Sequence, residues 1–299
     1  MSATHSRLGR ASAAEVIRST DGAQADPVWL RLLRHRSALM GLTVLGVFAL
    51  VATVGPLLVP FDPVQQDLDH ILELPSPAHP LGTDNFGRDE LLLLVYGARF
   101  TLGLGVLAVT VGVAAGAPLG AISGYFGGWV DMLVQRLAEI LLAFPTIVLA
   151  LALVAGLGPG LRNVVIAVGV SSVPGFIRVV RASALQQRSL MFVEAARALG
   201  VPSWRILVRH VMPNAAAPMI VQATIQMGVA ILVAAGLGFF GLGVQPPTPE
   251  WGALLGEAHT YIFSDANLAT FPGLCILLTV LAFNLTGDGL RDALDPRLR

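Results

Sequence analysis

Long runs of apolar residues alternate with short polar segments along the chain. Six runs approach the length of about 20 mostly apolar residues that a helix needs to cross a bilayer. They cover about residues 38–59, 100–123, 133–157, 163–182, 216–243 and 271–290. The fourth run is interrupted by Ser171, Ser172, Pro174 and Arg178. The pattern predicts an all-α membrane protein with six transmembrane helices.

The composition agrees with this assignment. Of 299 residues, 55% are hydrophobic and 13% are charged, and the mean hydropathy is +0.72. This is too apolar for an ordinary soluble domain. All 19 basic residues are arginine, which excludes a Walker A phosphate loop in this chain because that loop needs a lysine. The single cysteine, Cys275, excludes an intrachain disulfide and a cysteine-based metal site.

The arginines fall mainly on one side of the predicted spans. On the side that holds both termini they are Arg7, Arg10, Arg18, Arg31, Arg34, Arg36, Arg136, Arg178, Arg181, Arg188, Arg197, Arg205, Arg209, Arg291, Arg297 and Arg299, and on the other side they are Arg88, Arg99 and Arg162. Because arginine is enriched in cytoplasmic loops, both termini are expected in the cytoplasm. The first outer segment is acidic, in agreement with this orientation: Asp62, Asp67, Asp69, Glu73, Asp84, Asp89 and Glu90.

The same pattern divides the chain into segments. Residues 1–37 are an expected cytoplasmic tail, because its first part is polar and lacks the apolar core of a signal peptide. Residues 38–97 hold the first transmembrane helix and an outer loop. Residues 98–290 form the expected transmembrane core, with a cytoplasmic loop over about 183–215, and residues 291–299 form a cytoplasmic C-terminal tail.

Two glycine patterns predict helix packing. Gly112, Gly116 and Gly120 recur every four residues, which lets a neighbouring backbone approach closely. The alternative is that glycine is simply common in this chain. Gly236 and Gly241 bound a GxGxxG match. A dinucleotide site requires such a match to follow a strand and open a helix, whereas this one closes an apolar helix, which favours packing or a flexible helix end.

Two polar groups are candidate sites. Glu139 lies early in the third run, where a carboxylate is a candidate proton relay. Arg136 precedes it by three residues, however, and an i,i+3 ion pair near the interface is the favoured interpretation. His70, Glu73 and His79 match no familiar spacing of metal ligands, so solvated loop residues are favoured there. No motif places a Ser/His/Asp arrangement, and no catalytic residue is assigned.

Residues 191–214 place charged residues between two apolar runs. Residues 191–199 are good helix formers, Gly200 supplies a C-terminal stop, and a second helical piece begins at Pro202 and ends at Pro213. In the first piece, apolar and small residues cluster at helical spacing: Met191, Phe192, Ala195, Ala196 and Leu199. Two interpretations fit: a short helix held in the groove of another protein, and an amphipathic connector lying on the lipid surface.

A family resemblance favours the first interpretation. Glu194, Ala195, Ala196 and Gly200, followed by an apolar run to Pro213, resemble the EAA loop of the membrane subunits of bacterial ABC importers. Four further segments resemble the second permease subunit of dipeptide, oligopeptide and nickel importers: LGTDNFGRDE (81–90), YGARFTLGLG (96–105), PTPEWG (247–252) and NLTGDGLRDALDPRLR (284–299). The resemblance covers about residues 30–299, and its motifs agree in order.

The resemblance implies a type I ABC importer permease fold and a role for the loop. Glu194, Ala195, Ala196 and Gly200 would belong to a coupling helix that seats in a cleft of a cytoplasmic ATP-binding subunit and transmits its closure. The implied transporter contains a second homologous permease, two ATP-binding subunits that bind ATP and Mg²⁺, and an extracytoplasmic substrate-binding protein. The chain would lie in lipid, in the inner membrane of a bacterium, as a transport subunit without a cofactor, metal, nucleic acid or catalytic residue of its own.

Within this family, di- or oligopeptides are the expected substrates, and nickel or another small solute is the alternative. A secondary transporter with Glu139 as its relay is a rival from another class. It predicts paired broken helices in two related halves, and the sequence offers no convincing internal repeat. A structural protein of membrane assembly is a third interpretation, which the organised cytoplasmic loop disfavours.

Residues 244–270 are predicted to form an outer loop or short helix near the mouth of the pathway. Trp251 and Tyr261 are expected as interfacial aromatic residues. Glu250 and Glu257 are candidates for contact with the binding protein, but solvated loop carboxylates are the favoured interpretation.

Overall fold

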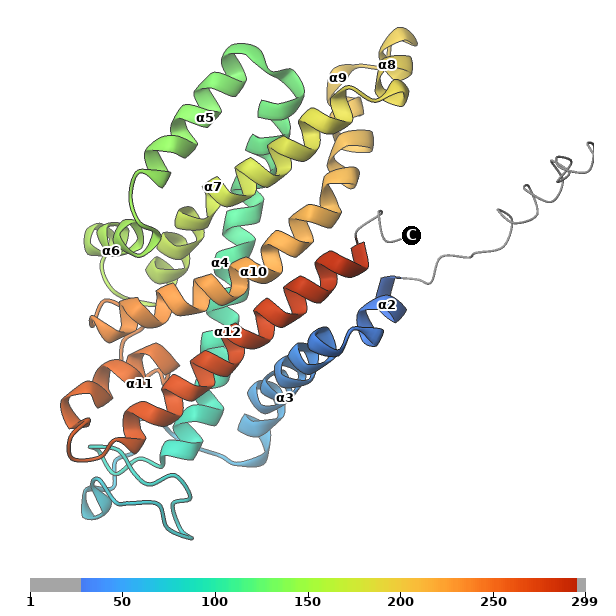
Figure 1. Ribbon diagram of the computed structural model, residues 1–299. Coiled ribbons are helices and arrows are strands. Elements are labelled where there is room, and N and C mark those ends of the chain that lie inside the picture. The colour runs from blue at the N-terminus through green and yellow to red at the C-terminus, as the bar shows by residue number, and fades with distance from the viewer. Residues whose placement is uncertain (1–27, 295–299) are drawn as a thin grey trace, which may run out of the picture.

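The computed structural model describes residues 28–294, so most of the predicted N-terminal tail and the end of the predicted C-terminal tail lie outside the described residues. The described residues form a helical bundle (Figure 1). Its helices are α2 (Val28–Arg34), α3 (Arg36–Leu58), α4 (Glu90–Phe126), α5 (Gly128–Leu142), α6 (Thr146–Leu157), α7 (Leu161–Arg188), α8 (Met191–Ala198), α9 (Ser203–Ile206), α10 (Met212–Phe239), α11 (Trp251–Ala258) and α12 (Asn267–Leu294). Short 3₁₀ turns cover Leu68–His70 and His259–Tyr261.

Among these residues, 5 helices are long and apolar enough to cross a membrane: α3, α4, α7, α12 and a continuous helix from Ser203 to Phe239. A sixth crossing exists if α5 and α6, which meet at 88°, count as one span. The prediction of an all-helical protein with six spans is confirmed in this form, but residues 133–157 are not one straight helix. Pro145 explains the break, because it lacks an N–H group and disfavours helical geometry at Phe144.

The predicted glycine ladder on α4 is a close helix contact with α7. A Cβ atom at Gly116 would lie 2.6 Å from the Cβ of Phe176, and one at Gly120 would lie 2.5 Å from the carbonyl oxygen of Ile177. Gly124 extends the ladder by one more turn, where a Cβ would lie 2.6 Å from the carbonyl oxygen of Arg181. Close packing of backbones is what stabilises helix pairs in lipid, so this contact holds the centre of the bundle.

The sequence predicted that the second helical piece of the loop ends at Pro213, and this prediction was wrong. The helix runs on from Ser203 to Phe239 through a π-helical turn over Leu207–Val211. In that turn the N–H group of Met212 donates to the carbonyl of Leu207, five residues back. The wider turn accommodates the ring of Pro213 and its missing N–H group without breaking the helix.

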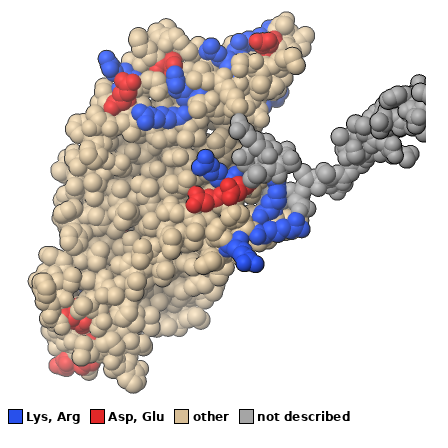
Figure 2. All heavy atoms as spheres, in the orientation of Figure 1, with Lys and Arg blue, Asp and Glu red and all other residues tan. Residues whose placement is uncertain are grey.

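Charged side chains lie at the ends of the bundle. Figure 2 shows them near α5, α8 and α9 at one end and beside α2 and the end of α12, with a few at the opposite end. The broad surface between these groups carries no charged side chain on the face shown. This distribution is what a membrane-spanning bundle requires, because charged groups within the hydrocarbon region are costly.

Candidate functional site

Helix α8 projects from the end of α7 and stops at Gly200 (Figure 1). Gly200 has φ of 75°, its N–H group donates to the carbonyl of Arg197 over 2.9 Å, and the N–H of Val201 donates to the carbonyl of Ala196 over 3.0 Å. These two bonds form a Schellman motif, in which the residue at the position of Gly200 must be left-handed. The predicted C-terminal stop at Gly200 is confirmed.

One buried side chain anchors α8 to the bundle. Val193 is 0% exposed and packs with Ile206 and Val211 from the following helix and with Val180 from α7. Val193 is not among the apolar residues that the helical spacing had grouped on one face of this segment. The available signal was a β-branched apolar side chain on the face opposite Ala195.

The other face of α8 is open. Met191 and Leu199 are both 84% exposed, and Glu194 and Ala195 are also exposed. Of the four residues implied as a coupling site, only Ala196 is half-buried, on the side of the bundle. Exposed apolar side chains on an anchored helix, with a small alanine between them, form a surface that another protein can cover.

Tyr125, at the end of α4, connects α8 to the two central helices. The Arg197 side chain of α8 lies with its guanidinium 5.1 Å from the Tyr125 ring centre, and its Nε donates to the Tyr125 hydroxyl over 3.4 Å. From α7, Arg188 Nη1 donates to the backbone carbonyl of Tyr125 over 3.3 Å. Tyr125 therefore contacts a side chain of α8 and a side chain of α7 at one position of α4.

A second brace joins α5 to α7 near this end. Arg181 of α7 donates from Nε and Nη2 to the two carboxylate oxygens of Asp131, over 2.6 Å and 2.7 Å. The hydroxyl of Ser123 on α4 donates to Asp131 as well. Two parallel bonds to one carboxylate fix geometry better than a single charge contact does, so α4, α5 and α7 are held together here.

At the opposite end, Glu250 and Trp251 are buried, so the expectations of a solvated carboxylate and an interfacial aromatic were wrong. Glu250 is 1% exposed and accepts hydrogen bonds from the Thr101 hydroxyl and the Ala253 N–H, both over 3.0 Å. Trp251 is 1% exposed and donates from Nε1 to the carbonyl of Leu94 over 3.0 Å. Burial raises the pKa of Glu250 above its ordinary value, although its hydrogen bonds act in the opposite direction.

Glu257 is not a solvated carboxylate either. It accepts a hydrogen bond from Nη2 of Arg88 over 3.0 Å, and Arg88 Nε donates to Asp84 over 2.6 Å. Arg88 is itself buried, and burial raises the pKa of Glu257 while the charge of Arg88 lowers it. Arg88 therefore ties the outer loop to α11.

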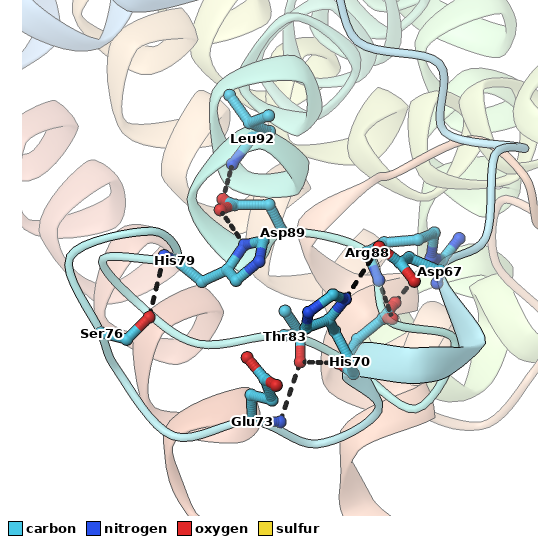
Figure 3. A network of polar contacts seen from close by, with 10 residues as sticks. Asp67, His70, Glu73, Ser76, His79, Thr83, Arg88, Asp89 and Leu92 are labelled. Atoms are coloured by element: carbon cyan, nitrogen blue, oxygen red, sulfur yellow. Dashed lines mark hydrogen bonds and ion pairs between the residues drawn. The ribbon is translucent and has the colours of Figure 1, made fainter.

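The outer histidines belong to separate pairs (Figure 3). His70 Nδ1 lies 2.9 Å from Asp67, and His79 Nδ1 lies 3.0 Å from Asp89. The hydrogen bond between Asp67 and His70 lowers the pKa of the Asp67 carboxyl and raises the pKa of the His70 imidazole. Within residues 28–294, no three His, Cys, Asp or Glu side chains are grouped as a metal site requires.

Comparisons with known proteins define the family. Residues 116–299 match the family described as binding-protein-dependent transport system inner membrane component, and residues 25–75 match the N-terminal TM domain of oligopeptide transport permease C. The chain is 46% identical over 269 residues to the dipeptide transport system permease protein DppC of Alkalihalophilus pseudofirmus. The matched region covers 90% of this chain and 88% of the relative.

The chain belongs to this family of inner-membrane transport permeases. It is also 45% identical over 273 residues to the glutathione transport system permease protein GsiD of Pectobacterium atrosepticum, which covers 91% of this chain and 90% of the relative. A solved structure of the methionine ABC transporter MetNI in an inward-facing conformation shares the fold, with a TM-score of 0.56 and 22% identity over 68% of this chain and 97% of that one. The permease is a multi-pass inner-membrane subunit of an ABC importer with the type I fold, as expected.

The remaining sequence candidates make the contacts that their positions in the sequence predicted. Glu139 lies 3.4 Å from Nη1 of Arg136, and both side chains are exposed, so the predicted i,i+3 pair is confirmed. The GxGxxG match closes α10, where a Cβ at Gly238 would lie 2.5 Å from the backbone of Gly252 on α11. This glycine serves helix packing, as predicted.

Proposed function

We propose that this permease imports di- or oligopeptides in an ATP-driven transporter. The support comes from the two relatives named above, one for a dipeptide and one for glutathione, which is itself a peptide. A nickel or other small-solute importer is the alternative within the family, and neither of these relatives favours it. The translocation pathway would form between this permease and a second, homologous permease.

We further propose that both termini and α8 lie in the cytoplasm. Most arginines lie in the terminal segments and in the part of the chain that includes the loop after α7, which the positive-inside rule assigns to the cytoplasm. In that orientation α8 would face one of the two ATP-binding subunits, and the outer loop and α11 would face an extracytoplasmic binding protein. ATP and Mg²⁺ would bind to the ATP-binding subunits, because this chain has no lysine for a phosphate loop.

The loop would couple ATP-driven closure to the movement of the spans. The observation that carries this proposal is the exposed face of α8, with Glu194 and Ala195, on a helix fixed by buried Val193. A cleft of an ATP-binding subunit would receive this face. A force on α8 would then reach α4 and α7 through the contacts of Arg197 and Arg188 with Tyr125.

Uptake by the assembled transporter in sealed vesicles tests the proposal. The purified complex is reconstituted with ATP inside and a loaded binding protein outside, and uptake of a radiolabelled dipeptide, glutathione and nickel is measured. We expect ATP-dependent uptake of at least one of the two peptides. Uptake of nickel alone would transfer the assignment to the alternative, and uptake that needs a proton gradient instead of ATP would refute it.

A further inference from the structure

Helix α2 has an exposed apolar face at the point where the chain enters the span formed by α3. Trp29 is 60% exposed, and Leu33 is exposed as well. The two residues are four positions apart, so they lie on the same face of α2. Helix α3 also exposes apolar side chains, beginning with Leu39 and Met40. Exposed apolar side chains are thus found on both sides of the junction between the two helices.

Three arginines accompany this apolar face. Arg31 and Arg34 lie on α2, and Arg36 begins α3. Arg34 and Arg36 are exposed, and residues 28–40 contain no aspartate or glutamate. Figure 2 shows basic side chains grouped beside α2 and the end of α12, with acidic side chains next to them. Exposed tryptophan and leucine together with arginine are typical of a helix that lies in a membrane interface.

The junction between α2 and α3 is held against the end of α12. His35 leaves the helical conformation, with φ of −83° and ψ of 110°. Its Nε2 lies 3.1 Å from Oδ2 of Asp292, so this carboxylate of α12 already has a partner. Ala38, in the first turn of α3, is buried and packs directly against Gly289 of α12. These contacts fix the place at which α2 begins relative to the spans.

That place corresponds to the surface of a membrane. Residues 38–58 of α3 contain no charged side chain, and at 1.5 Å per residue they extend over about 30 Å. This length equals the thickness of the hydrocarbon core of a bilayer. Arg36 therefore lies at the edge of the hydrocarbon core, and the adjoining α2 lies at the level of the lipid headgroups. Tryptophan is enriched at this level, and arginine binds phosphate groups well.

We propose that α2 is an interfacial anchor that binds anionic phospholipids. Trp29 and Leu33 contact the boundary of the acyl chains, and Arg34 and Arg36 contact the headgroup phosphates. Anionic lipids attract basic residues close to the membrane surface, so the arginines select anionic over zwitterionic headgroups. An ATP-binding subunit is the other occupant to consider at this end of the bundle, and the test separates the two. The inference goes beyond the proposed function, because it involves neither substrate nor ATP.

Fluorescence quenching by brominated lipids measures which lipid contacts Trp29. Brominated acyl chains quench the tryptophans that they touch, and the difference between the parent and Trp29→Phe isolates Trp29 from Trp129, Trp204 and Trp251. The assembled transporter, without substrate or ATP, is placed in bilayers of phosphatidylglycerol and phosphatidylcholine in equal parts. Only one of the two lipids is brominated in each sample. The two quenching curves give the ratio of the association constants of the two lipids at Trp29.

The same ratio is measured for variants of the arginines, each with and without Trp29→Phe. Arg34→Gln with Arg36→Gln removes both charges, and Arg34→Lys with Arg36→Lys keeps them. Arg162→Gln is the matched control, because it removes an exposed arginine in the first turn of α7. Co-purification of the other subunits reports assembly of each variant, and the parent is also measured at high salt, which needs no variant.

We expect phosphatidylglycerol to associate at Trp29 about tenfold more strongly than phosphatidylcholine in the parent, because two basic residues attract the anionic lipid. This preference should decrease at high salt, which screens exposed charges. The ratio should fall to about one in the double glutamine variant. The double lysine variant should keep most of the preference, because the attraction depends on charge. Arg162→Gln should match the parent.

Four results would overturn the inference. Equal quenching by the two lipids in the parent would remove the selectivity for anionic headgroups. Quenching of Trp29 by neither lipid would show that a protein subunit covers this face of α2. A preference that is unchanged in the double glutamine variant would exclude the two arginines as its cause, and an equal loss in the double lysine variant would make them structural residues. Failure of the transporter to take up peptides would refute the proposed function and would not change this measurement.

Discussion

The hydroxyl of Thr101 donates to Oε1 of Glu250 over 3.0 Å, across 149 residues of the chain. Thr101 lies in α4, and Glu250 is the residue before α11, whose first turn it caps through the N–H of Ala253. The backbone N–H group of Trp251 donates in turn to the Thr101 hydroxyl over 3.1 Å. Helix α11 is therefore part of the bundle and not a solvated loop.

Loss of this buried carboxylate should destabilise the permease. We expect Glu250→Ala to lower the free energy of unfolding by about 1–3 kcal/mol, because it leaves the Thr101 hydroxyl and the Ala253 N–H without an acceptor in a buried place. Glu250→Gln keeps one acceptor oxygen and should cost less. Thermal unfolding in detergent measures the difference, and equal melting temperatures for the parent and Glu250→Ala would contradict it.

The pH dependence of that difference follows from the pKa of Glu250, which burial raises above its ordinary value of 4.5. A raised pKa means that the folded state binds the proton more readily than the unfolded state does. The resulting stability is fully present below the unfolded pKa and is lost as the pH rises through the folded pKa. The melting temperature of the parent relative to Glu250→Gln should therefore increase as the pH falls from 7 toward 5. A relative decrease over that range would contradict the assignment of burial as the cause.

The glycine ladder gives a second stability test. A Cβ at Gly116 would meet the Cβ of Phe176 and the backbone of Val173, so Gly116→Ala must move α4 away from α7. We expect a cost of about 1–3 kcal/mol, as for other overpacked helix contacts. Gly103→Ala is the matched control in the same helix, because a Cβ at Gly103 meets nothing within 4 Å. Equal thermal stability of the two variants would contradict the packing argument.

Local patterns in the sequence predicted the local structure well. The apolar runs predicted the spans, the spacing of Gly116 and its neighbours predicted the α4–α7 contact, and Gly200 predicted the end of α8. The errors have non-local or subtle causes. The burial of Glu250 depends on Thr101, a partner far away in sequence that no periodicity reveals, and the helix passes Pro213 because a π-helical turn precedes it. For the candidate site, the helical spacing grouped Met191, Ala195 and Leu199, which are exposed, but it also included Ala196, which is half-buried. It did not single out Val193, because anchoring depends on tertiary packing.

Glu139 distinguishes ATP-driven import from proton-coupled transport. Its side chain is exposed and paired with Arg136, and an exposed pair is worth about 1 kcal/mol or less. We expect Glu139→Gln vesicles to retain parental uptake that requires ATP and is insensitive to a protonophore. Uptake by the parent that collapses with the proton gradient while ATP is present would favour the secondary transporter.

The proposed orientation is testable with reporters. A reporter that is active only in the cytoplasm should be active when it is fused after Arg299. The same reporter should be silent when it is inserted near Asp69, in the exposed part of the outer loop. The reverse pattern would place α8 outside the cell and would exclude its contact with ATP-binding subunits.

Substitutions in α8 test coupling itself. Gly200 holds φ of 75° with open space around it, so Gly200→Val is resisted by backbone geometry and not by a clash. The variant should misdirect α8 while the spans still insert. Gly200→Asn is the matched control, because asparagine tolerates the left-handed conformation. Glu194→Lys reverses an exposed charge near the start of α8 and should have a milder effect, since a surface ion pair is worth about 1 kcal/mol or less.

The most direct test of the coupling role is the number of peptide molecules taken up per ATP hydrolysed in reconstituted complexes of the parent, Gly200→Val and Gly200→Asn. With equal amounts of permease in the vesicles, we expect this ratio to fall at least tenfold in Gly200→Val, or the ATP-binding subunits to be lost during purification. The ratio for Gly200→Asn should stay near the parental value. A parental ratio in Gly200→Val, with the ATP-binding subunits fully retained, would contradict the assignment of α8 as the coupling helix.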